Sequence, residues 1–341
     1  MNNTFLDAIA KKPVTHTPIW VMRQAGRYLP EYQAVRAKAG SFLKLCKTPE
    51  LAAEVTLQPV HRFNMDAAIL FSDILTIPDA MGMGLSFVEG EGPRFHKELK
   101  LVEDIEALLV PDPEEALAYV TDTIRLLRPQ LKVPLIGFAG SPWTIAAYML
   151  EGGSPGEFKR TKAMLYDSPA LLHTLLSKLG ESVQLYLSAQ IDAGVDCVML
   201  FDTWGGILSE PAYQTFSLFY MEKIIQGLSH RYPDLPTILF TKGGGAWLHL
   251  YQKSAASVIG LDWQTPISKA KALLGDHYAL QGNLDPAILR SSDAVIEQEV
   301  ARIMQDFGGK TGHIFNLGHG ITPDIDPEKV KFLVDCVHQA V

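Results

Sequence analysis

The stretch "SPALLHTLLSKLGESVQLYLSAQIDAGVDCVMLF" (168–201) joins a helical pattern directly to a short apolar run. Ser168 suits a helix N-cap, Pro169 suits the first helical turn, and Gly194 suits the end of the helix. Apolar side chains recur down one face at Leu172, Leu176, Leu179, Val183, Leu187 and Ile191. The run "CVMLF" (197–201) is apolar on both faces, as expected of a buried parallel strand. We therefore predict an amphipathic helix followed by a buried strand.

Seven further apolar runs resemble this strand. They are "PIWVM" (18–22), "AAILF" (67–71), "PLIGFA" (134–139), "TILF" (237–240), "SVIGL" (257–261), "YALQG" (278–282) and "HIFNL" (313–317). Helical patterns lie between them, such as "DPEEALAYVTDTIRLLRPQL" (112–131), and "PEKVKFLVDCVHQAV" (327–341) closes the chain. Eight strand–helix repeats predict an α/β protein with a (β/α)8 TIM-type barrel, formed by residues 1–341 as a single domain. An open doubly wound sheet is the alternative, but no GxGxxG follows the first strand.

The composition narrows the class of protein. The 341 residues are 47% hydrophobic and 20% charged, which is typical of a soluble globular chain with a sizeable core. The net charge of −8 argues against nucleic acid as a partner. Three dispersed cysteines favour a reducing cytoplasm, and we expect neither a secretory signal nor a membrane-spanning segment.

In barrels of this kind the chemistry lies at the carboxyl ends of the strands. The residues found just beyond the predicted strands are Arg23, Arg27, Asp73, Tyr148 (further along a loop), Thr203, Lys242, Asp262, Asn283 and His319. We expect these side chains to converge on one mouth, which would hold cations, a carboxylate, hydroxyls and an imidazole. The motif "GMGLSFVEGEGP" (82–93), after the second strand, predicts a hairpin or a loop.

Three arginines, Arg23, Arg27 and Arg36, follow the first strand in "RQAGRYLPEYQAVRAKAG" (23–40). Pro30 suits the first turn of a short helix that carries Arg36, and Gly40 suits its end. Guanidinium groups close to a core need an anionic partner. That partner is either a bound anion or an internal acid such as Glu31 or Glu54, and for Arg36 the two alternatives are nearly even.

Several motifs together resemble one family. The stretches "MRQAGRYLPEY", "FSDIL", "GFAGSPWT", "YMLEGG", "GLDW", "QGNLDP" and "NLGHGI" are similar, in order and spacing, to those of uroporphyrinogen decarboxylases. The resemblance implies a single-domain barrel, usually a homodimer, that works without metal or cofactor. It also implies removal of the four acetate carboxyl groups of uroporphyrinogen III to give coproporphyrinogen III, in haem and chlorophyll synthesis.

The resemblance also implies site residues. The family's substrate-binding motif falls on Arg23, Gln24, Ala25, Gly26 and Arg27, its central carboxylate on Asp73, and its tyrosine and histidine on Tyr148 and His319. Thr203 stands where some members have serine and keeps the hydroxyl. Trp204 replaces a histidine of some relatives, which puts a role for that imidazole in doubt.

The chemistry of the implied substrate suits these groups. Protonating a pyrrole carbon creates a cation that accepts the electrons released with carbon dioxide, and the resulting methylene is then protonated to methyl. Asp73 would stabilise the cation and accept hydrogen bonds from the pyrrole N–H groups. We expect His319 to bind a substrate carboxylate instead of acting as the acid.

Three other functions remain open at this point. A zinc-dependent methyltransferase on the same barrel would need a thiolate-containing metal site, but Cys197 lies in a strand and Cys336 in the last helix. A Schiff-base lyase would use Lys242. A non-enzymatic tetrapyrrole carrier would use the arginines without needing Asp73.

Overall fold

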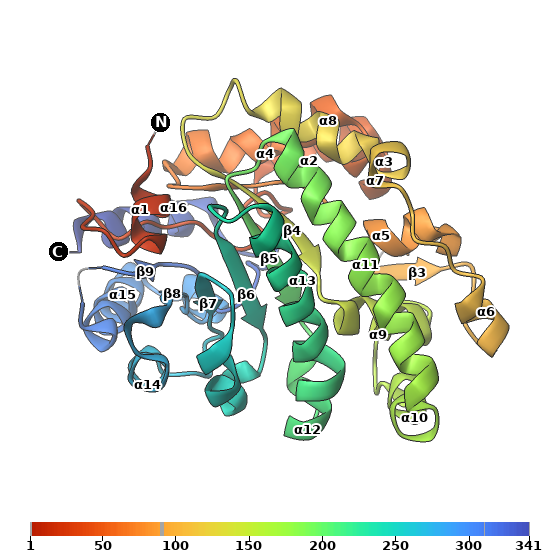
Figure 1. Ribbon diagram of the computed structural model, residues 1–341. Helices are drawn as coiled ribbons and strands as arrows, with labels where there is room; N and C mark the ends of the chain where they lie inside the picture. Colours follow the sequence, from red (N-terminus) through yellow and green to blue (C-terminus); the bar gives the residue numbers. More distant parts are fainter. Residues whose placement is uncertain (1, 89–91, 310, 341) are drawn as a thin grey trace.

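The computed structural model describes residues 2–88, 92–309 and 311–340. Seven parallel strands form one curled sheet in the order β1-β4-β5-β6-β7-β8-β9 (Figure 1). They are β1 (Ala68–Ile69), β4 (Leu135–Gly140), β5 (Cys197–Asp202), β6 (Thr237–Thr241), β7 (Val258–Gly260), β8 (Ala279–Gln281) and β9 (His313–Ile314). Each lies within or overlaps a predicted run, and all of their residues are buried. The fold is α/β, and its sheet is consistent with a TIM-type barrel.

The predicted first strand, 18–22, is present only as an isolated parallel bridge between Ile19 and Phe315. The Phe315 N–H donates to the Pro18 carbonyl at 2.8 Å, and the Asp66 N–H donates to the Ile19 carbonyl at 2.9 Å. A regular ladder stops there because side chains take the next backbone groups. The Val21 N–H donates to Gln24 Oε1 at 3.1 Å, and the Met22 N–H donates to Asn316 Oδ1 at 2.9 Å.

Helices surround the sheet (Figure 1). The longer ones are α2 (Pro30–Ala39), α4 (Pro49–Phe63), α8 (Ala118–Leu127), α9 (Pro142–Glu151), α10 (Lys159–Asp167), α11 (Pro169–Ala193), α13 (Phe219–Arg231), α14 (Ile267–Leu274), α15 (Asp293–Phe307) and α16 (Pro327–Gln339). The shorter ones are α1 (Thr4–Ile9), α3 (Phe42–Cys46), α5 (Thr76–Pro78), α6 (Val102–Glu106), α7 (Pro113–Ala116) and α12 (Glu210–Tyr213). Tight or widened turns are η1 (Asp79–Met83), η2 (Gly205–Ile207), η3 (Gln214–Leu218), η4 (Gly244–Lys253), η5 (Gly275–His277) and η6 (Pro286–Arg290).

The helix predicted from 168–194 is confirmed as α11. It begins at Pro169, and Gly194 ends it with a φ of 118°, a backbone conformation that glycine adopts without strain. Its predicted apolar face packs into the core, with Ile191 partly buried at the end. The α2 prediction is also confirmed, with Pro30 in the first turn and Gly40 at the C-cap.

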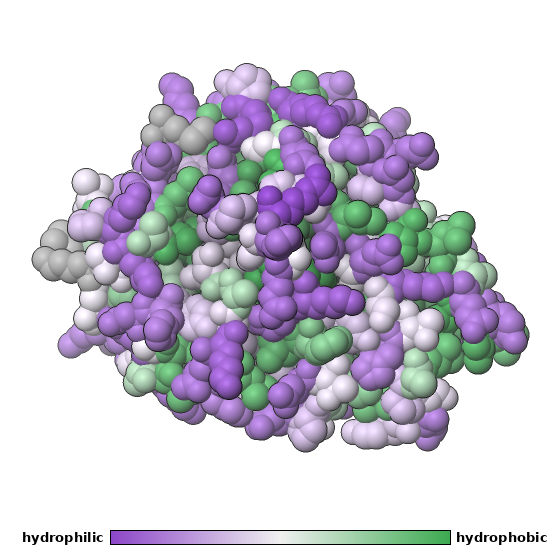
Figure 2. Space-filling view, viewed as in Figure 1, coloured by the Kyte–Doolittle hydropathy of each residue, from purple (hydrophilic) through white to green (hydrophobic). Residues whose placement is uncertain are grey.

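The motif at 82–93 forms an antiparallel hairpin of β2 (Leu85–Val88) and β3 (Gly92–Phe95), while its residues 89–91 lie outside the described part of the chain. The hairpin and α6 project at one end of the molecule (Figure 1). Figure 2 shows apolar side chains gathered at that end, where Leu101, Val102 and Leu109 are exposed.

Candidate active site

The first wall of the site is the loop from 22 to 29. Gln24 anchors it, since this fully buried side chain accepts from the Val21 N–H and donates to the Ala67 carbonyl at 3.2 Å. The Tyr28 hydroxyl donates to the Gln24 carbonyl at 2.8 Å, and the Ile321 N–H donates to the Met22 carbonyl at 2.9 Å. Ala25 and Gly26 lie half-buried within this loop. The loop is therefore tied both to the sheet and to the loop that follows β9.

Arg23 occupies the centre of that wall with a positive φ of 65°. Its side chain lies over Gly320, where an added Cβ would come within 2.7 Å of Arg23 Nε. The charge of Arg23 acts on three predicted site residues: it opposes the rise that burial causes in the pKa of Asp73 and of Tyr148, and it adds to the fall that burial causes in the pKa of His319. The structure thus brings these four residues together at the carboxyl end of the sheet.

Arg27 and Arg36 line an open cavity of about 450 Å³ together with Tyr32, Gln33, Ala37, Gly40 and Pro323. The predicted internal partner Glu31 is engaged elsewhere, since its carboxylate pairs with Arg62 at 3.0 Å. Across the described residues, the guanidinium groups of Arg23, Arg27 and Arg36 have no hydrogen bond or ion pair with a carboxylate. Within the described part of the chain, these three cations therefore have no internal carboxylate as a counter-ion.

Asp73 follows β1, as predicted. Its Oδ1 accepts from the Leu75 N–H at 2.8 Å, and its backbone carbonyl accepts from the Thr76 hydroxyl at 3.0 Å. Burial of the carboxyl group raises the pKa of Asp73, while the Leu75 N–H and the Arg23 charge oppose this rise. The carboxylate is half-buried, and a positive charge placed beside it would be stabilised more than in bulk water.

Tyr148 lies inside α9 and not along a loop, so the predicted placement was wrong. The helix begins at Pro142, soon after β4, because the Ser141 side chain accepts from the Thr144 N–H and Pro142 occupies the first turn. The Tyr148 ring lies 6.1 Å from the Trp204 ring, between centroids. Burial, and then the Asp73 charge, raise the pKa of the Tyr148 hydroxyl.

His319 follows β9 and lies 6.5 Å from the Phe240 ring, between centroids. Burial lowers the pKa of His319 to about 3, and the charges of Arg23 and Lys242 contribute to this. The imidazole is therefore neutral near pH 7.

Lys242 and two tryptophans complete this side of the mouth. The Lys242 Nζ lies 6.0 Å from the ring centroid of Trp204 and 5.8 Å from that of Trp263. Neither indole was predicted to form the site, although both follow strands, in "FDTW" and "GLDW". Their position just after two predicted strands could have indicated that both indoles belong to the site.

Buried acids behind the mouth hold these loops. Asp202 accepts from the hydroxyls of Ser141, Thr144 and Ser217 at 2.6–2.7 Å, directly before Thr203, which is half-buried. Asp262 accepts from the Gly243 N–H next to Lys242 and from the Thr265 hydroxyl at 3.1 Å.

Asn283 donates to the Asp262 carbonyl at 2.7 Å. The predicted mouth residues Asp262 and Asn283 are therefore scaffold and do not point into the opening.

Comparison with known proteins gives a consistent result. The family model "Uroporphyrinogen decarboxylase (URO-D)" matches residues 1–340. Uroporphyrinogen decarboxylases from Tolumonas auensis and Thioalkalivibrio sulfidiphilus are each 58% identical to the chain, covering 99% of it and 96% and 98% of their own lengths. One from Pseudomonas aeruginosa is 57% identical, covering 99% of the chain and 97% of its own length.

Solved structures share the fold. A methyltransferase from Methanosarcina mazei superposes with a TM-score of 0.82 over 98% of this chain and 97% of its own, at 20% identity. A B12-independent methionine synthase from Shewanella superposes with a TM-score of 0.54 at 12% identity, covering 94% and 93% of the two chains. In the described part of the chain, no helix has the length and apolar character required to cross a bilayer.

Proposed function

The chain belongs to the uroporphyrinogen decarboxylase family, and from that premise we propose how its mouth residues act on uroporphyrinogen III to give coproporphyrinogen III. It is a decarboxylase of tetrapyrrole biosynthesis. The substrate is a flexible reduced macrocycle with eight carboxylates, four of them on the acetate side chains that the reaction shortens. Such a polyanion needs a local cluster of cations on a chain whose net charge is −8.

The observation that carries the proposal is the set of three guanidinium groups, Arg23, Arg27 and Arg36, without internal carboxylate partners in the described chain. Each charged hydrogen bond to a substrate carboxylate contributes about 1.5–3 kcal/mol, and bidentate pairing fixes orientation. Arg23 faces the reacting centre beside Asp73, while Arg27 and Arg36 would hold carboxylates at the rim. Gln24 acts indirectly by fixing the loop that presents both Arg23 and Arg27.

Asp73 is the proposed catalytic group. Ring protonation makes the pyrrole cationic, and the C–C bond electrons of the leaving carboxylate flow into the ring. The exocyclic methylene then takes a second proton, and the ring carbon loses the first one, which restores the pyrrole. At about 4 Å and an effective dielectric near 20, the carboxylate and this cation attract by about 4 kcal/mol. The attraction develops as the cation forms, so it lowers the barrier more than it tightens substrate binding.

The remaining site residues are assigned to binding. Neutral His319 and Tyr148 can hydrogen-bond to a substrate carboxylate on either side of Asp73, and Lys242 supplies a further positive charge. The Thr203 hydroxyl lies on the same rim, beside Trp204. None of these groups is needed as an electron sink, because the ring itself accepts the electrons.

The finer architecture is also part of the proposal. Residues 18–21 take the eighth strand position, so that the sheet closes into a full (β/α)8 barrel and residues 1–341 form one domain. Hydrogen bonds on both sides of Ile19, to the loops at Asp66 and Phe315, support this closure. A homodimer in the cytoplasm is the proposed working form, and light scattering on the eluted protein would measure its mass.

The alternatives are less favoured. The likeness to a methyltransferase extends to the fold alone, since identity is 20%. Cys197 is fully buried in β5, and Cys336 lies in α16 away from the mouth. Lys242 lies between two indoles, and the proposed reaction needs no Schiff base, because the substrate ring accepts the electrons. A carrier would leave the half-buried Asp73 beside Arg23 unexplained.

The test is anaerobic incubation with reduced uroporphyrinogen III, without added metal or cofactor, with products separated by carboxyl number. We expect the wild type to give the four-carboxyl product. Asp73→Asn should lose roughly a thousandfold in kcat, the rate equivalent of about 4 kcal/mol. Asp122→Asn, which changes an exposed acid paired with Arg125, serves as the matched control. An inactive wild type, or near-normal turnover by Asp73→Asn, would overturn the proposal.

A further inference from the structure

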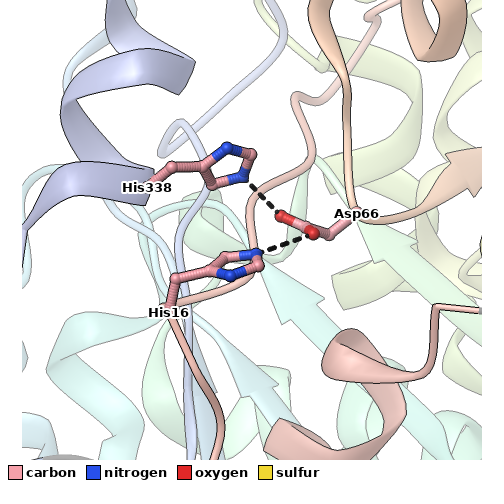
Figure 3. Close-up of side chains that lie close together, drawn as sticks. All are labelled: His16, Asp66 and His338. Carbon is pink, nitrogen blue, oxygen red and sulfur yellow. Dashed lines mark hydrogen bonds and ion pairs between the residues drawn. The ribbon is translucent and has the colours of Figure 1, made fainter.

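Two histidines and an aspartate converge at the opposite end of the sheet from the mouth (Figure 3). His16 precedes the 18–21 segment, Asp66 precedes β1, and His338 lies in the last turn of α16. Their donor atoms lie within 4.8 Å of one another, and no other such group of His, Cys, Asp or Glu occurs among the described residues. Three distant parts of the chain thus supply one compact cluster.

The two imidazoles present the same ring nitrogen to one carboxylate. His16 Nε2 lies 2.9 Å from Asp66 Oδ1, and His338 Nε2 lies 2.8 Å from Asp66 Oδ2. The rings meet at an angle of 63° with centroids 4.5 Å apart. The side chain of Asp66 is 2% exposed, whereas those of His16 and His338 are 24% and 19% exposed. The carboxylate is therefore the floor of the cluster, and the imidazoles form a rim that solvent reaches.

Surrounding groups fix the orientation of these donors. The Ile19 N–H donates to Asp66 Oδ2 at 2.9 Å, and Asn2 Nδ2 donates to Asp66 Oδ1 at 3.2 Å. His16 Nδ1 lies 3.2 Å from the Thr15 hydroxyl. Partners of this kind orient ligands and select the histidine tautomer in metal sites. For His16 they leave Nε2 as the nitrogen directed into the cluster.

We propose that His16, Asp66 and His338 bind one divalent transition-metal ion of the Zn²⁺ type. Two imidazoles and one carboxylate match the ligand preference of Zn²⁺, whereas Mg²⁺ and Ca²⁺ prefer sets of oxygen ligands. Bonds of about 2.0–2.1 Å in a tetrahedron place the ligand atoms about 3.3 Å apart. The two N···O distances here are 2.9 and 2.8 Å, and all the donor atoms lie within 4.8 Å of one another, so small side-chain movements would suffice. On binding, a neutral imidazole would carry its one proton on Nδ1, an imidazolium would release its Nε2 proton to solvent, and water would fill the fourth position.

A bound ion would cross-link three segments of the chain and so stabilise the fold. It joins the N-terminal segment, the start of β1 and the C-terminal helix α16, next to the bridge between Ile19 and Phe315. A metal held by the folded chain and not by the unfolded chain raises the midpoint of thermal unfolding. Because the cluster lies away from the mouth, decarboxylation should not require the ion.

Titration of the full-length protein, purified without a polyhistidine tag and treated with chelator, tests the proposal. We expect one Zn²⁺ per chain, a rise in Tm of roughly 4 °C at saturation, and no response to Mg²⁺. Co²⁺ should give visible absorption bands of a low-coordinate site. His16→Gln and His338→Gln should each weaken Zn²⁺ binding at least about tenfold. His230→Gln, an exposed histidine on α13, should leave binding unchanged.

Asp66→Asn is the stricter variant, but its buried side chain also supports the fold, so His16→Gln decides if Asp66→Asn fails to fold. A zinc-edge anomalous difference map should place the ion between the three side chains. Binding that is equal in His16→Gln and wild type, binding that His230→Gln abolishes, or an ion located elsewhere would each overturn the proposal. So would the absence of binding, which would leave the cluster as a hydrogen-bonded latch.

Discussion

His319 shows how single residues are tuned at the mouth. Burial and two nearby cations, Arg23 and Lys242, lower its pKa to about 3 in the free protein. A lowered pKa means that the neutral form is favoured, so the imidazole carries a proton only well below neutral pH. A general acid for ring protonation needs a proton to give at working pH, and free His319 lacks that extra proton.

We predict that His319→Gln weakens substrate binding without removing an ionisation from the pH profile of kcat/KM. Between about pH 5 and 8 the wild-type and variant profiles should have the same shape, with the variant lower by roughly tenfold, because free His319 does not titrate there. Steady-state rates across that range measure this. A basic or acidic limb present in wild type and missing in the variant would make His319 the proton donor.

The sequence motifs predicted the charged residues of the candidate site but not the contacts of their neighbours. Arg23, Asp73 and His319 follow strand ends, so the topology alone predicts that they meet. Gln24 sits in the same motif, yet its side chain is fully buried and bonded to the backbone of Val21 and Ala67. The Asp66 cluster contains His16 and His338, which are more than 300 positions apart in the sequence. No local sequence pattern predicts a contact between residues so far apart.

At the scale of elements, the loop after residue 22 packs against the loop after β9, and Gly320 lies at the contact. The Arg23 side chain passes over Gly320, and an added Cβ would contact its Cδ, Cγ and Nε atoms. The Met22 carbonyl and the Ile321 N–H join the same two loops by a hydrogen bond of 2.9 Å. Gly320 therefore allows the Arg23 side chain to take its position, because no Cβ stands in its way.

We predict that Gly320→Ala displaces Arg23 and lowers kcat/KM by roughly tenfold to a hundredfold, because a small misplacement of a positioning charge is costly in catalysis. The free energy of unfolding should change by about 1–3 kcal/mol, as expected for overpacking. Kinetics and thermal unfolding of the variant measure both effects. Gly156→Ala is the matched control, since an added Cβ there meets nothing within 4 Å. Equal kinetics for the two variants would mean that Gly320 does not position Arg23.

Observed strands match the predicted runs where backbone hydrogen bonds to neighbouring strands are formed. They are shorter than predicted where side chains hydrogen-bond to the backbone instead. The runs at 134–139 and 197–201 become β4 and β5 because neighbouring strands satisfy both of their edges. The run at 18–22 narrows to a bridge because Gln24 and Asn316 take its amides. Composition cannot reveal which side chains will compete in this way.

At the scale of the whole molecule, charge sets a conflict between the protein and its proposed substrate. The chain carries a net charge of −8, and the substrate carries eight carboxylates. Arg23 and Lys242 nevertheless lie close to His319, Arg27 and Arg36 line one cavity, and Glu31, an internal partner expected for the arginines, pairs with Arg62 instead. Because Glu31 is paired elsewhere, these four cations face Asp73 as the one acid that the proposal places among them, and we expect a positive local field.

The sign of the salt dependence distinguishes the local field from the net charge. If the mouth cations steer the substrate, kcat/KM should fall several-fold as ionic strength rises from about 0.01 M to 0.15 M, because the Debye length shrinks from about 30 Å to about 8 Å. Arg27→Gln should flatten this dependence, whereas Arg231→Gln, an exposed arginine paired with Asp192 on the outer helices, should not. If the net charge dominated instead, added salt would relieve repulsion and raise kcat/KM, and the arginine cluster would not be what captures the polyanion.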